Sequence, residues 1–251
     1  MTARFVLGAV PVDRVTAAEA LDRIGALVEA GRGGAVFTPN VDHVVLASRV
    51  PDLARAYAAA DLSLADGVPV VWASRLLGAP VPEKVSGSDL LLPLVERAAA
   101  RGWRTYLLGG APGVADEAAA RLRARFPALV VAGADAPRLT VDGAGDESAA
   151  ALARLAAARP QLVLVALGAP KQELWIHRHR AALAPAVAVG VGAALDFAAG
   201  RVRRAPRWVS RAGLEWLWRL AREPRRLWRR YLMQDPAFAA ILWRALRARR
   251  P

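Results

Sequence analysis

The chain has 251 residues, of which 55% are hydrophobic, and it carries no cysteine and a formal net charge of +13. This length and apolar content allow one large α/β domain with a substantial core. The lack of cysteine excludes disulfides, thiol nucleophiles and thiolate metal sites.

Short apolar runs alternate along the chain with alanine-rich segments of helical periodicity. The runs predict strands at residues 6–10, 35–38, 105–108, 129–131, 162–167 and 187–191. The segments between them predict helices at residues 17–30, 41–60, 68–77, 88–101, 113–126, 147–158 and 171–182. Near-continuous apolar strands separated by helices indicate an α/β fold with a mostly parallel sheet and helices on both faces.

The sequence contains neither a recognisable secretory signal nor an apolar run long enough to span a membrane. The apolar run in residues 1–13 is interrupted by Pro11 and Asp13, which does not fit a secretory signal. The longest uncharged run, residues 181–195, contains Pro185 and is shorter than a spanning helix. We therefore expect a cytoplasmic protein that is at most peripherally attached to a membrane.

Ligands of parallel sheets bind at the carboxyl ends of the strands, and this rule points to residues 38–40, 109–113, 168–173 and 190–192. Gly109, Gly110 and Gly113 precede a predicted helix, as does Gly168 in the next loop. Glycines before a helix let the backbone and its free amides approach a diphosphate, although an ordinary strand-to-helix turn is the alternative. The spacing matches neither the dinucleotide fingerprint nor the phosphate loop. A nucleoside diphosphate fits better than NAD or ATP.

Polar residues that interrupt apolar surroundings are the candidates for chemistry. Asp66 ends an apolar stretch and could accept a proton from a sugar hydroxyl, or it could cap the helix predicted at 68–77. Thr38 and Asn40 lie at a strand exit, where they could bind a sugar or cap the next helix. The sequence around His43 shows no pattern that would indicate a partner residue for it. Because no Asp-x-Asp pair is present, we expect a metal-free reaction in which arginine, lysine and helix ends neutralise a leaving diphosphate.

The charge is concentrated at the C-terminus. Residues 201–251 hold 15 arginines against 3 acidic residues, and five of the eight tryptophans. Arginine combined with interfacial aromatics suits an anionic bilayer surface. We expect a catalytic domain at residues 1–200 and a basic, Trp-rich helical appendage at residues 201–251, in which Pro224 starts a second helix. The appendage would dock on the membrane from about Arg207 and close over the site; a solvated helix at a subunit contact is the alternative.

Seven blocks follow one another along the chain up to about Leu232: TPNVDHVV, ADGVPVVWASRLLG, EKVSGSDLL, YLLGGAPGVADEAA, LVLVALGAPKQELWI, VGVGAALDFAAGRVRRAPRW and GLEWLWRLAREPRRLWRRYL. In this order they resemble the WecG/TagA/CpsF family of bacterial glycosyltransferases. The resemblance implies a Rossmann-like fold and an inverting, metal-independent transfer of an N-acetylmannosamine-type sugar. The implied donor is a UDP-sugar and the implied acceptor is undecaprenyl-diphosphate-linked N-acetylglucosamine, for a surface polysaccharide such as teichoic acid or common antigen.

The resemblance also implies roles for single residues. Asp66 matches the family's proposed general base, and Thr38 and Asn40 match polar residues that line the substrate pocket. Gln172 matches the glutamine of the Gly-x-Pro-x-Gln-Glu motif, and Asp196 matches a position on the nucleotide side.

Basic residues complete the resemblance. Arg219, Arg226 and Arg229 match C-terminal arginines of the family that meet a substrate diphosphate. Relatives usually carry arginine before Val-x-Gly, where this chain has Lys84. Lysine keeps the charge but lacks the bidentate fork of arginine, so phosphate binding there is expected to be weaker or differently aimed.

Two other classes of protein are less consistent with the sequence. Residues 1–200 hold 20 basic against 19 acidic residues and no nucleic-acid-binding motif, which argues against a nucleic-acid-binding protein. The missing glycine fingerprint argues against a dehydrogenase. The sequence leaves open whether the donor carries N-acetylmannosamine, its uronic acid or another hexose, and whether the chain forms a homo-oligomer.

Overall fold

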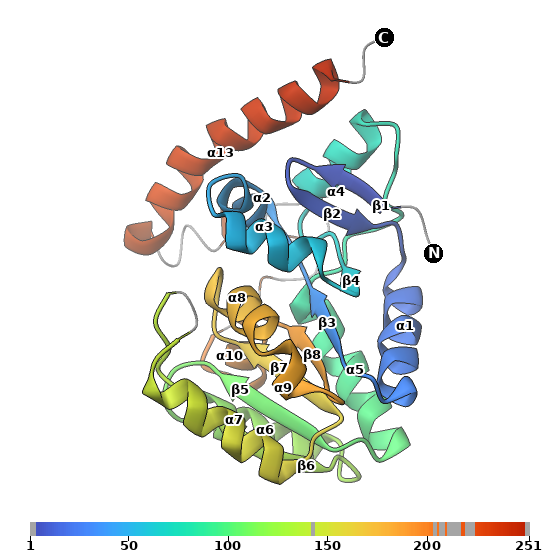
Figure 1. Ribbon diagram of the computed structural model, residues 1–251, viewed down its shortest axis with the longest axis vertical. Helices are drawn as coiled ribbons and strands as arrows, with labels where there is room; N and C mark the ends of the chain where they lie inside the picture. Colours follow the sequence, from blue (N-terminus) through green and yellow to red (C-terminus); the bar gives the residue numbers. More distant parts are fainter. Residues whose placement is uncertain are drawn as a thin grey trace.

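The computed structural model describes residues 4–141, 144–202, 205, 209, 217–218 and 224–248. Its centre is a six-stranded sheet in the order β4-β3-β8-β7-β5-β6, with every neighbouring pair parallel (Figure 1). The predicted fold class is therefore confirmed. The strands are β3 (Gly34–Phe37), β4 (Leu62–Ser63), β5 (Thr105–Gly109), β6 (Val131–Asp135), β7 (Leu162–Ala166) and β8 (Val187–Gly190).

Helices cover both faces of the sheet because alternate strand residues point to opposite sides. Leu162 and Leu164 of β7 pack into one apolar cluster, whereas Val163 and Val165 pack into the other. The first cluster is covered by α1 (Ala17–Ala30), α5 (Gly87–Arg101), α6 (Val114–Arg125) and α10 (Ala194–Ala198). The second is covered by α3 (Pro51–Ala58), α7 (Asp146–Ala158), α8 (Lys171–Arg178) and α9 (Arg180–Leu183).

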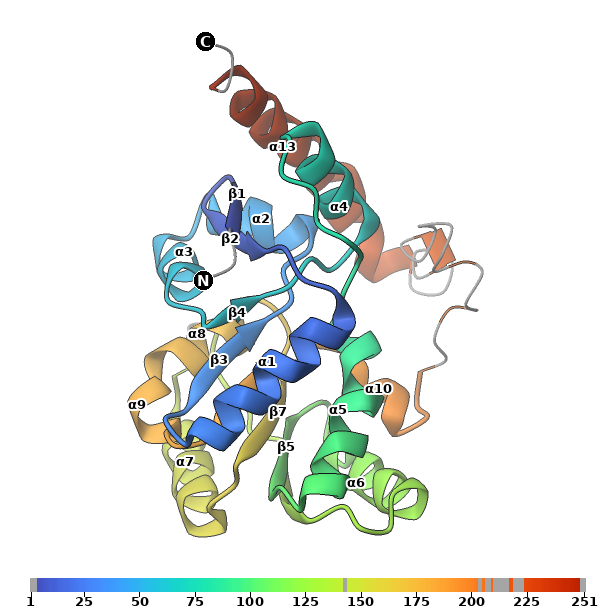
Figure 2. The ribbon, with the colours of Figure 1, turned by 90° about the vertical axis from the view of Figure 1, so that its right-hand side faces the viewer.

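A smaller group of elements lies beyond the carboxyl ends of β3 and β4 (Figures 1 and 2). It contains the antiparallel hairpin β1 (Arg4–Leu7) and β2 (Val10–Asp13), with α2 (Val41–Ala47), α4 (Val68–Leu76) and the long α13 (Pro224–Arg247). Helix α13 packs mainly on α2 and also touches β1. As predicted, a helix begins at Pro224. Within the described ranges, no helix is both long and apolar enough to cross a bilayer.

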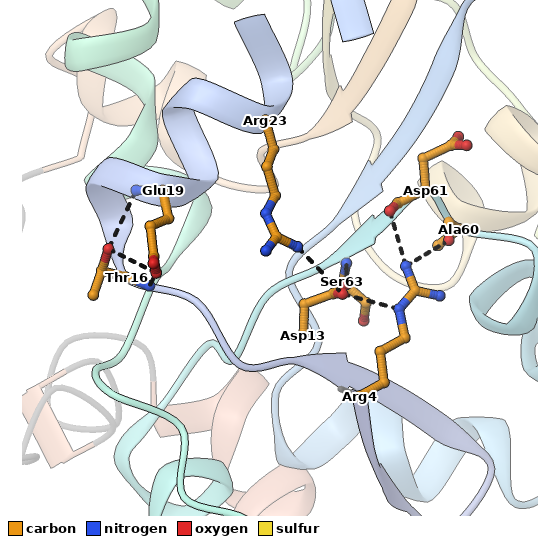
Figure 3. Close-up of polar contacts among 8 residues, drawn as sticks. All are labelled: Arg4, Asp13, Thr16, Glu19, Arg23, Ala60, Asp61 and Ser63. Atoms are coloured by element: carbon orange, nitrogen blue, oxygen red, sulfur yellow. Dashed lines mark hydrogen bonds and ion pairs between the residues drawn. The ribbon is translucent and has the colours of Figure 1, made fainter. Parts of the chain in front are cut away.

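A buried carboxylate fastens the hairpin to the sheet (Figure 3). Asp13 is 3% exposed; its Oδ1 accepts from Arg4 Nε at 3.0 Å and its Oδ2 accepts from the amide of Ser63 at 2.8 Å. Arg4 also donates to the carbonyl oxygens of Ala60 and Asp61, at 2.9 and 2.8 Å. These bonds hold β4, which has only two residues and was not predicted, in the position from which the chain reaches Asp66.

The single strand predicted at residues 6–10 is wrong. The chain turns there, because Gly8 adopts a φ of +62° at the first position of a two-residue hairpin loop, the place where such turns favour glycine. The strand predicted at residues 129–131 is observed instead at Val131–Asp135.

Two predicted helices are shorter than expected. The helix predicted at residues 41–60 is divided into α2 and α3, because Val50 is extended, with φ of −117°, ahead of Pro51, as the proline ring requires of the preceding residue. The helix predicted at residues 171–182 ends at Arg178, and the short α9 follows it.

Candidate active site

Five neighbouring strands deliver the candidate residues to one edge of the sheet. In the order of the sheet, the exits of β4, β3, β8, β7 and β5 carry, respectively, Asp66, residues 38–40, residues 190–192, residues 168–173 and residues 109–113. The rule that ligands bind at the carboxyl ends of parallel strands therefore applies to all of them at once. Asp66 stands at one end of this row and the predicted nucleotide glycines stand at the other.

Asp66 is half-buried on the turn between β4 and α4. Its amide donates to the carbonyl oxygen of Pro39 at 2.9 Å, which joins this turn to the loop of Thr38 and Asn40. The alternative interpretation of Asp66 as a helix cap is wrong: the N-cap of α4 is Gly67, with φ of +113° and no side-chain cap bond.

Lys84 reaches the same region from the segment before α5. The amide of the next residue, Val85, donates to the carbonyl oxygen of Ala65 at 2.8 Å, so this segment runs beside the Asp66 turn. The Lys84 ammonium lies 3.2 Å from Oδ2 of Asp89, and its side chain is 19% exposed. The structure thus brings the backbone beside Lys84 next to the Asp66 turn, while the ammonium itself pairs with Asp89.

Thr38 and Asn40 both make bonds within the protein. The Thr38 hydroxyl donates to the carbonyl oxygen of Gly190 at 3.3 Å and connects the β3 exit to the β8 exit. Asn40 is the N-cap of α2, and its side chain accepts from the amide of His43 at 3.4 Å. The capping alternative for Asn40 is therefore confirmed. A contact of either residue with a sugar stays a prediction.

Beneath these loops lies a buried polar cluster that sequence reasoning missed. The sequence around His43 shows no partner pattern, but in the structure its Nδ1 lies 2.7 Å from Oδ1 of Asn40 and its Nε2 lies 3.6 Å from Oε1 of the fully buried Glu173. The hydroxyl of Tyr57 has no hydrogen-bond partner among the described residues. Burial, and then the carboxylates of Glu173 and Asp66, raise the pKa of Tyr57 well above its usual value. The cluster ties α2, α3 and α8 together under the site.

Gln172 holds two of the strand exits together. Its side chain is 3% exposed; Oε1 accepts from the amide of Gly192 at 3.2 Å, and Nε2 donates to Oε1 of Glu173 at 2.6 Å. A Cβ on Gly190 would lie 3.0 Å from Gln172 Nε2, so the side chain sits directly against the β8 exit. Gln172 therefore shapes the loop, and its predicted contact with substrate stays a prediction.

A pocket of about 360 Å³ opens at the part of this edge where the predicted nucleotide-binding glycines lie. Three predicted nucleotide-binding residues line it together: Gly110, Gly168 and Asp196. Gly168 has φ of +74°, and a Cβ there would meet nothing within 4 Å, so the backbone at this point is open to a ligand. The whole lining is formed by Gly110, Pro137, Arg138, Leu139, Ala166, Leu167, Gly168, Lys171, Gly192, Ala193 and Asp196.

The other two predicted glycines lie beside the pocket lining. Gly109 packs against β7, where an added Cβ would lie 2.5 Å from the carbonyl oxygen of Ala166, so only glycine fits. Gly113 is the N-cap of α6, with the guanidinium of Arg201 3.0 Å from the position of its absent Cβ. Arg201 pairs with Glu117 of α6 at 2.7 Å, and this bond lowers the pKa of Glu117. The arginine is thereby held at the start of the helix.

Two cations in the pocket lining were not assigned from the sequence. Arg138 belongs to the loop after β6, and Lys171 donates from Nζ to the carbonyl oxygen of Leu139 at 3.0 Å, which holds that loop against α8. The sequence does contain a signal for these residues. A strand predicted to extend to Asp135 would have included residues 136–139 among the loops at the carboxyl ends of the strands. The apolar run at residues 129–131 instead placed the strand too early.

The appendage residues are only partly covered by the structure. Arg219 lies outside the described residues. Arg226 and Arg229 lie on the described backbone of α13, but the positions of their side chains lie outside what the structure describes. Their contacts with a diphosphate stay predictions.

Comparison with known proteins gives one family and several close relatives. The model of the glycosyl transferase WecG/TagA/CpsF family matches residues 5–251. A Bacillus spizizenii protein named N-acetylglucosaminyldiphosphoundecaprenol N-acetyl-beta-D-mannosaminyltransferase is 34% identical over 215 residues, which cover 86% of this chain and 81% of the relative. A Bacillus subtilis protein of the same name is 31% identical over 200 residues, covering 80% of this chain and 75% of the relative. Together with the parallel sheet and its row of strand-exit loops, these matches show that the chain belongs to the WecG/TagA/CpsF family of glycosyltransferases.

Proposed function

We propose that this chain transfers an N-acetylmannosamine-type residue from a UDP donor to N-acetylglucosamine linked to a polyprenyl diphosphate, with inversion, for a bacterial surface polysaccharide. The observation that carries the proposal is the pair of relatives bearing that acceptor and sugar in their names, each aligned over at least 80% of this chain. The pocket and the row of strand exits support it, because they offer a nucleotide side and a separate side for the acceptor.

On the nucleotide side, UDP would occupy the pocket lined by Gly110, Gly168 and Asp196. Glycine lets the backbone approach a ligand closely, and the free amides at the start of α6 can donate hydrogen bonds. Both features suit the diphosphate. Arg138 and Lys171 bring positive charge to the same lining, and Asp196 offers a carboxylate to the hydroxyls of the nucleoside. Cations and amides aimed at the leaving diphosphate stabilise the charge that it gains in the transition state.

On the acceptor side, Asp66 is the proposed general base. The 4-hydroxyl oxygen of the acceptor sugar attacks the anomeric carbon of the donor, the bond from that carbon to UDP breaks, and the hydroxyl proton passes to the Asp66 carboxylate. This single displacement inverts the configuration at the anomeric carbon. A carboxylate is a weak base at neutral pH, so it assists mainly as positive charge develops on the attacking oxygen. Thr38, Asn40 and Lys84 would orient the sugar and its diphosphate.

The acceptor lipid places this reaction at a membrane surface, with the basic appendage as the proposed closing element. Arg219, Arg226 and Arg229 would meet a substrate diphosphate when residues 201–251 dock over the site. The predicted location is therefore the cytoplasmic face of the cell membrane, with peripheral attachment. Nucleotide sugars and lipid-linked intermediates would meet there.

A donor panel tests the proposal. Purified protein is mixed with UDP-N-acetylmannosamine, its uronic acid, UDP-N-acetylglucosamine and UDP-glucose, each with a short-chain lipid-diphosphate N-acetylglucosamine, and the product mass is measured. We expect one N-acetylhexosamine unit to be added from the first donor, with or without EDTA. Transfer from the uronic acid or glucose donor alone would assign a different sugar, and no transfer from any donor would contradict the proposal.

A further inference from the structure

Helix α4 presents two large apolar side chains to solvent. Trp72 is 58% exposed and Leu76 is 63% exposed. They are four residues apart, so they lie on one face of the helix, and the exposed Arg75 stands beside them. Opposite this face, Val70, Val71 and other side chains of α4 are buried. A tryptophan and a leucine side by side on the outside of a helix form an apolar patch that a freely soluble surface usually avoids.

The C-terminal half of α13 has the same composition. Trp243 is 54% exposed, and the guanidinium of Arg247 lies 4.6 Å from the centre of its ring. Arg244 is exposed next to it. Figures 1 and 2 both show α4 beside this part of α13, and both helices contribute buried residues to one apolar cluster. The two exposed patches therefore belong to the same end of the molecule.

The charged residues of these two helical segments are of one sign. The sequence of α4 and residues 236–248 contain no acidic residue, whereas they contain three arginines: Arg75, Arg244 and Arg247. Tryptophan, leucine and arginine together are the side chains of a surface that lies in the headgroup region of an anionic bilayer. The aromatic rings suit the boundary between lipid and water, and the guanidinium groups suit lipid phosphates.

The position of α4 links this face to the chemistry. The helix begins at Val68, two residues after Asp66. With a rise of about 1.5 Å per residue, Trp72 and Leu76 lie roughly 6 and 12 Å along the helix from Val68. An acceptor whose sugar is joined by a diphosphate to a membrane lipid stays close to the surface. A docked α4 would hold the candidate base within reach of that sugar.

We propose that α4 and the C-terminal half of α13 form one membrane-contact face, which we call the α4–α13 face: Trp72, Leu76 and Trp243 enter an anionic bilayer, and Arg75, Arg244 and Arg247 bind lipid phosphates. The proposal rests on the proposed function, since the lipid-linked acceptor supplies the reason for contact. It goes further because it assigns part of the membrane contact to a helix of the catalytic domain, next to Asp66, rather than to the appendage alone.

Flotation with vesicles tests the face directly. The full chain is mixed with vesicles of phosphatidylcholine alone or with phosphatidylglycerol, and the bound fraction is measured. For the double variant Trp72→Ser/Leu76→Ser we expect about tenfold weaker binding to the anionic vesicles, because less apolar surface is buried. The matched control is Val141→Ser, which changes a side chain that is 65% exposed in the loop after β6. Equal binding of the double variant and the wild type would overturn the proposal.

Charge and folding are examined with two further variants. Replacing Arg75, Arg244 and Arg247 by glutamine should weaken binding to anionic vesicles by about fivefold for each arginine removed and abolish the preference over neutral vesicles. Trp243→Ser should act in the same direction as the α4 variant. The thermal midpoint of each variant identifies any that unfold, and a folded Trp243→Ser protein with wild-type flotation would remove α13 from the face.

Activity separates failure of this face from failure of the proposed function. With the short-chain acceptor in solution, Trp72→Ser/Leu76→Ser should retain the wild-type rate, and with the full-length lipid in vesicles it should lose about tenfold, in line with its weaker binding. If the wild type transfers no sugar at all, the function fails, while flotation still decides the face. If the double variant binds vesicles as the wild type does but sediments as a monomer where the wild type sediments as a dimer, the face is a contact between two copies of the chain. The proposal is then wrong.

Discussion

The amide of Asp66 donates a hydrogen bond to the carbonyl oxygen of Pro39 over 2.9 Å. This bond fixes the candidate base to the loop of Thr38 and Asn40, and the loop is itself fixed to the exit of β8 by the bond from Thr38 to Gly190. The proposed acceptor side of the candidate site thus consists of two turns on adjacent strands that hydrogen bonds hold together. The bond at Asp66 is made by its backbone amide, so substitution of the Asp66 side chain should leave this bond in place.

Replacing Asp66 by asparagine should lower kcat by about 10²- to 10⁴-fold, because a general base typically contributes that factor. Binding of UDP, measured by calorimetry, should stay unchanged, since the pocket lies at the other end of the row. The control is Asp22→Asn, which removes a carboxylate that is 71% exposed and pairs with Arg97 on the surface. Full turnover by a folded Asp66→Asn protein would refute the assignment of the base.

Replacing Asp196 by asparagine should weaken donor binding. The carboxylate lines the pocket, and loss of a hydrogen bond to a charged group costs about 1.5–3 kcal/mol, so the KM for the donor should rise by roughly tenfold or more. The KM for the acceptor should not change. Glu29→Gln, which removes an exposed surface pair with Arg101, serves as the control. An unchanged dissociation constant for UDP in the Asp196 variant would place the nucleotide elsewhere.

Replacing Asp13 by alanine should destabilise the fold rather than change the chemistry directly. The variant leaves the amide of Ser63 and the Arg4 guanidinium without the acceptor that joins them. Breaking a fully buried ion pair costs about 3–5 kcal/mol, and because the Arg4 side chain is 28% exposed we expect a loss at or below the lower end of that range. Urea unfolding measures the loss. The comparison variant is Asp52→Ala, which removes an exposed pair with Arg55 and should cost no more than about 1 kcal/mol; equal effects of the two variants would contradict the role of Asp13.

Replacing Tyr57 by phenylalanine should leave stability at pH 8 unchanged or slightly raised, because the buried hydroxyl has no partner among the described residues. The variant should differ from wild type at high pH. The folded pKa of Tyr57 is raised well above 10 by burial, so above pH 10 the tyrosine ionises only in the unfolded chain, and wild-type stability falls by up to about 1.4 kcal/mol per pH unit. The phenylalanine variant lacks this loss.

Urea unfolding of both proteins between pH 8 and 11 measures the difference. Tyr106→Phe is the comparison, because its pKa is also raised, chiefly by burial, but its hydroxyl bonds to Arg154. That variant should lose stability at pH 8, which Tyr57→Phe should not. Parallel stability curves for wild type and Tyr57→Phe above pH 10 would show that the hydroxyl is not held in an apolar environment.

Local sequence patterns determined most of the secondary structure. The helix predicted at residues 17–30 is observed at Ala17–Ala30, where Thr16 and Glu19 form a capping box and Gly31 ends the helix in a left-handed conformation. Both signals are read from neighbouring residues, so no tertiary contact is needed to find them. The apolar runs of β5, β7 and β8 likewise identified a sheet buried on both faces.

The same patterns predicted which loops form the candidate site, but they did not predict the contacts within it. The strand-exit rule named the loops of Thr38, Gly110, Gly168 and Gly192, because the carboxyl ends of parallel strands share one edge. It did not indicate that Gln172 lies under Gly192 or that Arg138 enters the pocket lining. Side-chain direction within a loop depends on packing against other elements, which no local pattern contains.

The sequence by itself determined the fold class, the family resemblance and the basic, aromatic C-terminus, since each is a matter of composition, periodicity or motif order. Only the tertiary structure decided that β4 exists, that His43 faces Glu173, and that α4 and α13 expose their tryptophans at one end of the molecule. The strand β4 has two residues and is held by Asp13, fifty positions away from Ser63. Contacts over such separations are set by how the layers pack, and the chain reaches them only when it is folded.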